Sequence, residues 1–115
     1  MNNEAEEKKW IGKLYYSIGE VAEFFDMNTS KLRFWEKEFA EIKPQKNANG
    51  ERRYTQEDIE KIKMIYHLVE EKGFTLEGAR QKLRHNPQGV KGQQEVVEKL
   101  KKIRNYLLEL KKELN

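Results

Sequence analysis

Residues 16–54 read YSIGEVAEFFDMNTSKLRFWEKEFAEIKPQKNANGERRY, and they contain the signals for two short helices followed by a basic hairpin. Ser17 and Glu20 match the capping box, in which the hydroxyl and the carboxylate each accept a hydrogen bond from a backbone N–H group. Apolar residues follow from Ile18 at positions i, i+3, i+4 and i+7, which is the spacing of one buried helix face. We therefore expect the domain to begin with a short helix at Ser17.

A second helix is predicted after a turn at Asp26 and Met27, because Asn28 is a good N-cap residue. Its inward face carries the large apolar side chains, which are Leu32, Trp35 and Phe39. Its outer face carries polar, basic and aromatic side chains, which are Ser30, Arg33, Phe34 and Lys37, with Thr29 at the start of the helix. A helix, a tight turn and a second helix with a polar outer face form an arrangement that enters a DNA groove.

A hairpin is predicted directly after this pair. Pro44 prevents the second helix from continuing, and Asn49-Gly50 is a strong hairpin-turn dipeptide because both residues tolerate positive φ. The flanking residues are expected to pair as a short exposed ribbon. Residues 43–53 hold four basic residues and one acidic residue, a concentration of charge that favours phosphate contact. The order of elements predicts a mainly α protein, a winged helix-turn-helix with a small two-stranded wing.

The second half of the chain adds three helices to this prediction. Thr55 caps the third helix and Thr75 caps the fourth, while residues 85–92 contain one proline and two glycines and are expected to form a linker. Six aliphatic residues then follow at spacings of 4, 3, 4, 3 and 4, namely Val96, Leu100, Ile103, Leu107, Leu110 and Leu114. This heptad pattern predicts a coiled-coil helix over residues 93–115 that pairs two copies of the chain.

The expected organisation is therefore a tail over 1–13, a DNA-binding domain over 14–84, the linker over 85–92, and the dimerisation helix. With 115 residues and a net charge of +3, the chain has room for one small domain with appendages. It has no cysteine, which excludes disulfides and thiolate metal sites, and its two histidines are too few and too scattered for a metal site. We expect no cofactor, no membrane segment, and a cytoplasmic protein associated with the nucleoid.

Four short motifs follow one another along the chain: Y-S-I-G-E-V-A at 16–22, L-R-F-W-E at 32–36, G-E-R-R-Y at 50–54, and G-F-T-L-E at 73–77. In this order and at this spacing, they closely resemble the motifs of the MerR family of bacterial transcription regulators. The resemblance implies a homodimer, joined by an antiparallel coiled coil, on a pseudo-palindromic operator in double-stranded DNA. It also implies that the dimer bends or untwists promoter DNA so that RNA polymerase engages both promoter elements.

The resemblance also assigns positions. Arg33 and the residues around Ser30 belong to the recognition helix, and Arg52 is the wing arginine. The residues expected to contact DNA are Thr29, Ser30, Arg33, Phe34, Lys37, Lys46, Asn47, Arg52, Arg53 and Tyr54. The sequence departs from the family where Phe34 and Trp35 replace two usual tyrosines, which removes a phenolic phosphate contact at Phe34. It also ends at the heptad helix, where many relatives continue into an effector-binding domain.

Several alternatives remain open from the sequence. Arg33 and Lys37 could simply solvate a helix face, and the two wing arginines could protect a strand edge. Because side chains alternate along a strand, at most one of these arginines reads DNA directly. Phe34 could lie against a sugar or a thymine methyl group, or pack under the wing.

The heptad helix could pack back on its own domain instead of pairing. The leading function is sequence-specific DNA binding and regulation of transcription, and the alternative is an architectural or recombination accessory protein of the excisionase-like or chromosome-anchoring kind. An enzyme is not expected, because the sequence shows no Ser/His/Asp set, metal cluster or phosphate-binding glycine loop.

Overall fold

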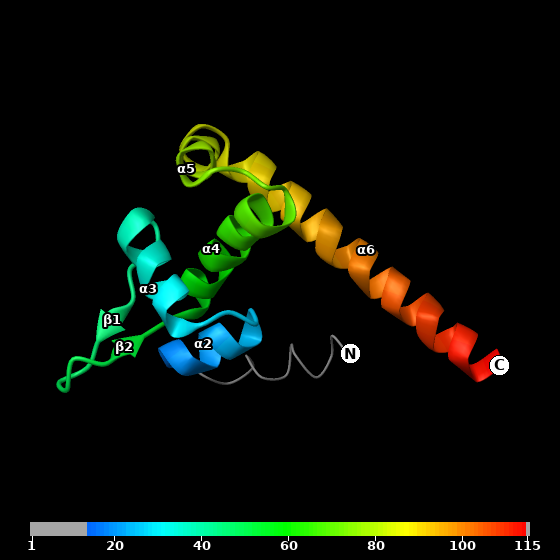
Figure 1. The fold of residues 1–115 in the computed structure, drawn as a ribbon, viewed down its shortest axis with the longest axis horizontal. Helices are drawn as coiled ribbons and strands as arrows, with labels where there is room; N and C mark the ends of the chain where they lie inside the picture. The colour runs from blue at the N-terminus through cyan, green and yellow to red at the C-terminus, as the bar shows by residue number, and fades with distance from the viewer. Residues whose placement is uncertain (1–13, 115) are drawn as a thin grey trace.

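The computed structural model describes residues 14–114, and the predicted tail over 1–13 lies outside this range. The protein is mainly helical with one small two-stranded sheet, which confirms the predicted fold class (Figure 1). The elements in chain order are α2 (Ile18–Phe24), α3 (Thr29–Glu38), β1 (Gln45–Lys46), β2 (Arg52–Arg53), α4 (Gln56–Tyr66), the π-helical segment η1 (His67–Glu71), α5 (Leu76–His85) and α6 (Pro87–Leu114).

The helix-turn-helix pair α2 and α3 is defined by local caps. The Ser17 hydroxyl accepts a hydrogen bond from the Glu20 amide at 3.1 Å, and the Glu20 carboxylate accepts one from the Ser17 amide at 3.0 Å. Asp26 takes a positive φ of 52° in the turn, which Asp tolerates better than most residues. The Asn28 side chain then caps α3 by accepting a hydrogen bond from the Lys31 amide at 2.7 Å. These caps are the ones that the sequence predicted.

The wing is an antiparallel pair in which Gln45 lies opposite Arg53 and Lys46 lies opposite Arg52. Its turn differs from the predicted one, since Gly50 has a positive φ (80°) and Asn49 does not. The Asn47 carbonyl accepts a hydrogen bond from the Gly50 amide, and the Asn47 amide donates to the Glu51 carbonyl. The loop therefore contains three residues and ends in a left-handed glycine, a common hairpin geometry.

The base of the wing is joined to the N-terminal segment of the domain. Tyr16 and Tyr54 form an isolated antiparallel bridge, with both N–H···O distances at 2.8 Å. Both tyrosines are buried in the core, which also contains Leu32, Trp35 and Phe39 as predicted. The bridge holds Tyr54, the residue directly after β2, inside the domain and beneath α3.

Helices α4 and α5 complete the core. Thr55 and Asp58 form a second capping box at the start of α4, and Thr75 caps α5. The apolar face of α4 and η1 is buried through Ile59, Ile62, Ile65 and Leu68. Gly73 follows η1 with a φ of 75°, the left-handed conformation expected of a helix-terminating glycine.

The predicted linker over 85–92 is wrong, because α6 already begins at Pro87 and runs for 28 residues. Proline is favoured at the first position of a helix, and the Asn86 side chain caps the helix by accepting from the Gly89 amide at 3.1 Å. A Cβ atom at Gly89 would lie 2.3 Å from the side-chain nitrogen Nδ2 of Asn86. Glycine at this position therefore makes room for the capping side chain and does not indicate a flexible segment. Val90 is buried one turn further on, which anchors the first turns of α6 on the core.

The remainder of α6 extends away from the domain, on the side opposite to the wing (Figure 1). Two ion pairs hold its middle to the body of the protein, one between Lys101 and Glu71 of η1 and one between Glu98 and Lys63 of α4. Over residues 14–114, none of the helices has the length and apolar character needed to cross a membrane.

Candidate nucleic-acid interface

The outer face of α3 is open to solvent, as the sequence predicted. Ser30, Arg33 and Lys37 are exposed, and Phe34 is 46% exposed although it is apolar. Thr29, the first residue of the helix, is half-buried. Leu32 and Trp35 point the other way and are buried, which fixes the rotation of the helix on the core. The face therefore presents two cations, a hydroxyl and one aromatic ring to any partner.

An ion pair joins this helix to the wing. The Nε atom of Arg52 on β2 donates to the Glu36 carboxylate of α3 at 2.6 Å, and the Tyr54 hydroxyl donates to the same oxygen at 3.1 Å. Both side chains of the Arg52–Glu36 pair are about three-quarters buried, with 25% and 20% of their surface exposed. Glu36 therefore fixes the position of the wing relative to α3.

Tyr54 does not reach the surface, so its predicted contact with DNA is wrong. Its fractional exposure is 0%, because the bridge to Tyr16 holds it in the core. Burial raises the pKa of Tyr54 well above its ordinary value, and the charge and hydrogen bond of Glu36 raise it further. The phenol therefore stays protonated and acts as a hydrogen-bond donor to Glu36.

The two wing arginines lie on opposite sides of β2, as the alternation of strand side chains predicted. Arg53 is exposed, and its guanidinium carbon lies 5.7 Å from the centre of the Tyr15 ring, within the range of a cation–π contact. Arg52 instead faces α3 and Glu36. The other two predicted wing residues differ from each other in their surroundings. Lys46 is exposed, whereas Asn47 is half-buried. The side chain of Asn47 accepts hydrogen bonds from the backbone amides of Asn49 and Glu51. Asn47 therefore shapes the turn.

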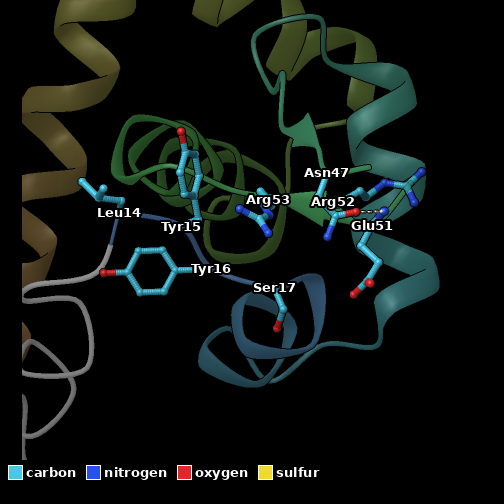
Figure 2. A pocket seen from close by; sticks show the side chains of 8 residues that line it. All are labelled: Leu14, Tyr15, Tyr16, Ser17, Asn47, Glu51, Arg52 and Arg53. Carbon is cyan, nitrogen blue, oxygen red and sulfur yellow. Dashed lines mark hydrogen bonds between the residues drawn. The ribbon is translucent and has the colours of Figure 1, made fainter. Parts of the chain in front are cut away.

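An open cavity of about 520 Å³ lies between the wing and the segment before α2 (Figure 2). Arg53 and Tyr15 line it together with Ser17 and Asn47. Tyr15 was not among the predicted site residues. The sequence signal for it would have been an aromatic residue directly before the first helix cap, but the contact with Arg53 depends on the nonlocal Tyr16–Tyr54 bridge.

A second ion pair supports the far end of α3. The Nη1 atom of Arg80 on α5 donates to the Glu38 carboxylate at 2.6 Å and to the Glu38 backbone carbonyl at 3.2 Å. A cation at a helix C-terminus satisfies an unpaired carbonyl and interacts favourably with the helix dipole. Glu36 and Glu38 thus hold the wing and α5 against the same helix. Local sequence patterns give no signal for this supporting role, because the partners of the two carboxylates lie 16 and 42 positions further along the chain.

The heptad residues of α6 form a separate exposed surface, which we call the apolar seam. Its members are 38% to 87% exposed, and they are Val96, Leu100, Ile103, Leu107, Leu110 and Leu114. The opposite side of the helix packs on the domain through Val90 and Gln94. The seam therefore does not pack back on its own domain, which rejects one of the two alternatives left open by the sequence.

The described part of the chain contains no cluster of three or more His, Cys, Asp or Glu side chains able to hold a metal ion. The interface consists of cations, amides, hydroxyls and aromatic rings on α3 and the wing. Such groups contact phosphates and base edges by hydrogen bonding and charge, without covalent chemistry.

Known proteins share both the sequence and the fold of this region. The sequence model of the MerR HTH family regulatory proteins matches residues 16–86. The HTH-type transcriptional regulator MlrA of Escherichia coli is 36% identical over 55 residues, which are 48% of this chain and 23% of that protein. The E. coli HTH-type transcriptional regulator ZntR is 32% identical over 68 residues, which are 59% of this chain and 48% of that protein. The chain thus spans less than half the length of either curated relative.

Two solved structures show a similar fold over most of the chain. The first is HiNmlR, a MerR family regulator lacking the sensor domain and bound to promoter DNA, with a TM-score of 0.54, 19% identity and 88% of each chain covered. The second is a MerR family regulator from Bacillus cereus, with a TM-score of 0.55, 23% identity, and 87% of this chain and 82% of that chain covered.

The named relatives are transcriptional regulators, which confirms the prediction that the chain is not an enzyme. The family model covers all the elements from the Tyr16 bridge to the end of α5, including α3 and the wing. Because this match extends over more than half of the sequence, the chain belongs to the MerR family of helix-turn-helix regulatory proteins.

Proposed function

We propose that this protein is a homodimeric, sequence-specific regulator of transcription that bends or untwists double-stranded promoter DNA. The observation that carries the proposal is the ion pair between Glu36 and Arg52, which holds the wing and the exposed face of α3 as one rigid surface. A recognition helix needs such a support to enter the major groove at a set angle while a second arm grips the backbone.

Within this surface, Arg33 and the residues around Ser30 face the base edges, and Lys37 and the wing cations contact phosphates. Thr29, half-buried at the start of α3, lies at the margin of the contact. The division follows a general feature of protein–DNA interfaces, in which phosphate contacts set the register and base contacts give specificity. That HiNmlR has been solved on promoter DNA with the same fold supports this use of the surface.

The apolar seam of α6 supplies the dimer contact in this proposal. A single winged domain reads only a few base pairs, and two domains at a fixed separation are needed to recognise a pseudo-palindromic operator. In the family arrangement the two seams pair antiparallel, which places the two α3 helices at opposite ends of the dimer. The proposed partners are therefore a second copy of the chain, operator DNA and RNA polymerase at the promoter. The proposed site of action is the nucleoid in the cytoplasm.

Binding to genomic DNA tests the proposal. The full chain would be titrated against fragments that cover a bacterial genome, and the bound fragments would be sequenced. We expect a few discrete sites inside promoters, each with an inverted repeat. Concentration at recombination sites, or dispersed binding without a repeat, would instead support the architectural or recombination accessory role.

The effect on DNA shape has its own measurement. Circular permutation of a selected site within one fragment reports bending, since the mobility of a bent complex depends on the position of the site. We expect a clear dependence on position. A complex whose mobility is the same for every position would reject the bending part of the proposal.

A further inference from the structure

Phe34 is the one apolar side chain on the outer face of α3 within the described residues, and nearly half of its surface is open to solvent. The residues around it on that face are polar or basic. Ser30 lies one turn before it, Lys37 lies one turn after it, and Arg33 is its neighbour along the chain. Since 46% of its surface is exposed, the ring is not enclosed by the rest of the protein. The ring is therefore available to the DNA.

The chemistry of the ring limits what it can recognise. Phenylalanine has no hydroxyl group, so it offers neither a donor nor an acceptor to a phosphate oxygen or to a polar base edge. The 5-methyl group of thymine is the apolar group that base pairs present in the major groove. An exposed ring among hydrogen-bonding side chains therefore fits a thymine methyl group better than any other feature of the groove floor.

The position of Phe34 in the helix directs the ring toward the bases. Long side chains on a helix lean toward its N-terminus, so the ring is expected to cover the turn that carries Ser30. In helix-turn-helix proteins, the N-terminal part of the recognition helix contacts base edges. Phe34 is the sixth residue of the ten in α3, and this lean places its ring over the base-facing half. Lys37 lies one turn further on, and in the proposed complex it contacts the DNA backbone.

We propose that Phe34 is a specificity-determining residue that recognises the 5-methyl group of a thymine in each operator half-site. This inference rests on the proposed function, since it requires sequence-specific binding to double-stranded DNA. It adds the chemical identity of one recognised group, and it predicts that the preferred half-site contains a thymine that uracil cannot replace without loss.

Methyl-deleted DNA tests the inference directly. A high-affinity duplex would be selected from a random pool with the full chain, and each thymine would then be replaced singly by uracil, which pairs identically but lacks the methyl group. We expect one position in each half-site where the replacement weakens binding about fourfold, which is the usual effect of removing one buried carbon group from a contact. Uracil at the other positions should leave affinity unchanged.

Two variants assign the effect to the ring. In Phe34→Ala, the thymine and uracil duplexes should bind equally, because the apolar partner of the methyl group is gone. In the matched control Arg33→Ala, binding should weaken for both duplexes while the fourfold ratio between them persists. A double-mutant cycle between the ring and the methyl group then measures their coupling.

The possible failures are distinct. Specific binding without any uracil-sensitive position would overturn this inference and leave the proposed function intact. A uracil effect that persists unchanged in Phe34→Ala would also overturn it, because another residue would then contact the methyl group. An absence of sequence-specific binding by the parent protein would overturn the proposed function, and this inference with it.

Discussion

The Glu36 carboxylate on α3 accepts hydrogen bonds from two wing residues, the Nε atom of Arg52 at 2.6 Å and the hydroxyl of Tyr54 at 3.1 Å. This acidic residue is therefore a structural part of the surface that we propose contacts DNA, which is itself a polyanion. Its charge is offset by Arg52, and its position lies behind the exposed face of α3. We infer that the Glu36 carboxylate neutralises part of the positive charge of the wing, and that the same contacts fix the position of the wing relative to α3.

The first prediction concerns this support. Glu36→Ala would leave the buried Tyr54 hydroxyl without its acceptor, so we expect the free energy of unfolding to fall by about 1–3 kcal/mol. Glu36→Gln keeps an acceptor oxygen and should lose less. Urea denaturation followed by circular dichroism measures both. Equal stability of the parent and Glu36→Ala would show that the wing is positioned by other contacts.

The second prediction concerns Arg33. If this side chain makes a bidentate contact with a guanine, Arg33→Ala should weaken binding to the operator by about 1–3 kcal/mol and relax the base preference at one position. The charge-matched control is Lys112→Ala, at the far end of α6 and away from the apolar seam. Fluorescence anisotropy with the operator and with a scrambled duplex separates the two effects. An Arg33→Ala variant with parental affinity and a native fold would contradict the prediction.

The third prediction separates the two wing arginines. If Arg52 contacts a phosphate, Arg52→Ala should weaken binding to all sequences and lower the slope of log K against log salt by about one unit. Arg53→Ala is the comparison variant, since it removes the same charge on the other side of β2, beside Tyr15. A slope that changes only in Arg53→Ala would identify Arg53 as the DNA arm and leave Arg52 as a partner of Glu36.

The elements that the sequence predicted correctly are those with local signals. The caps at Ser17, Thr55 and Thr75 each involve residues three apart, so a short window contains all the groups that form the hydrogen bonds. The buried faces of α3 and α4 follow in the same way from helical spacing. The heptad pattern likewise identified the exposed side of α6, although not where the helix begins.

The errors arise where tertiary contacts decide the structure. Residues 85–92 resemble a linker in composition, but the Asn86 cap and the burial of Val90 stabilise a helix there. Tyr54 ends a basic hairpin and was assigned to the DNA surface, but its bridge to Tyr16, 38 positions earlier, places it in the core. Such nonlocal pairings leave no periodic pattern in the sequence, and the same holds for the Tyr15–Arg53 contact.

The fourth prediction concerns pH. Burial raises the pKa of the Glu71 carboxyl, whereas hydrogen bonds from Lys101 of α6 and from the buried His67 lower it. The effect of the hydrogen bonds is larger in sum, so the pKa lies below its ordinary value of 4.5. Folding therefore favours the ionised carboxylate. The resulting stabilisation is complete above about pH 4.5 and is lost as the pH falls through the lower pKa of the folded state.

Comparing the parent with Glu71→Gln isolates this contribution, because the other carboxylates titrate in both proteins. A quarter of the Glu71 side chain is exposed, so solvent screening limits the expected difference in unfolding free energy to about 1 kcal/mol at pH 7. Denaturation at pH 7 and at pH 3 measures it, and the difference should shrink at the lower pH. A constant difference would mean that Glu71 acts through packing and not through its charge.

The fifth prediction concerns assembly. The apolar seam leaves six aliphatic side chains exposed along one side of α6, and burying each would contribute about 1.5–3 kcal/mol before the cost of ordering and association. Three heptads form a short coil, so we expect weak dimers in free solution. In the proposed complex, operator DNA binds two domains at once. It should therefore strengthen dimerisation by the same factor by which dimerisation strengthens DNA binding.

Replacing Ile103 and Leu107 together by Glu tests this link. Both side chains are exposed and lie beyond the turns that pack on the core, so the domain over residues 14–84 should remain folded with its normal circular dichroism spectrum. Sedimentation should show only monomers, and affinity for a full operator should fall to that for a single half-site. The control Lys112→Glu places a new negative charge on the other side of the helix and should retain both properties. A double variant that binds the full operator as tightly as the parent would show that the seam does not hold the dimer, and that another surface sets the distance between the two recognition helices.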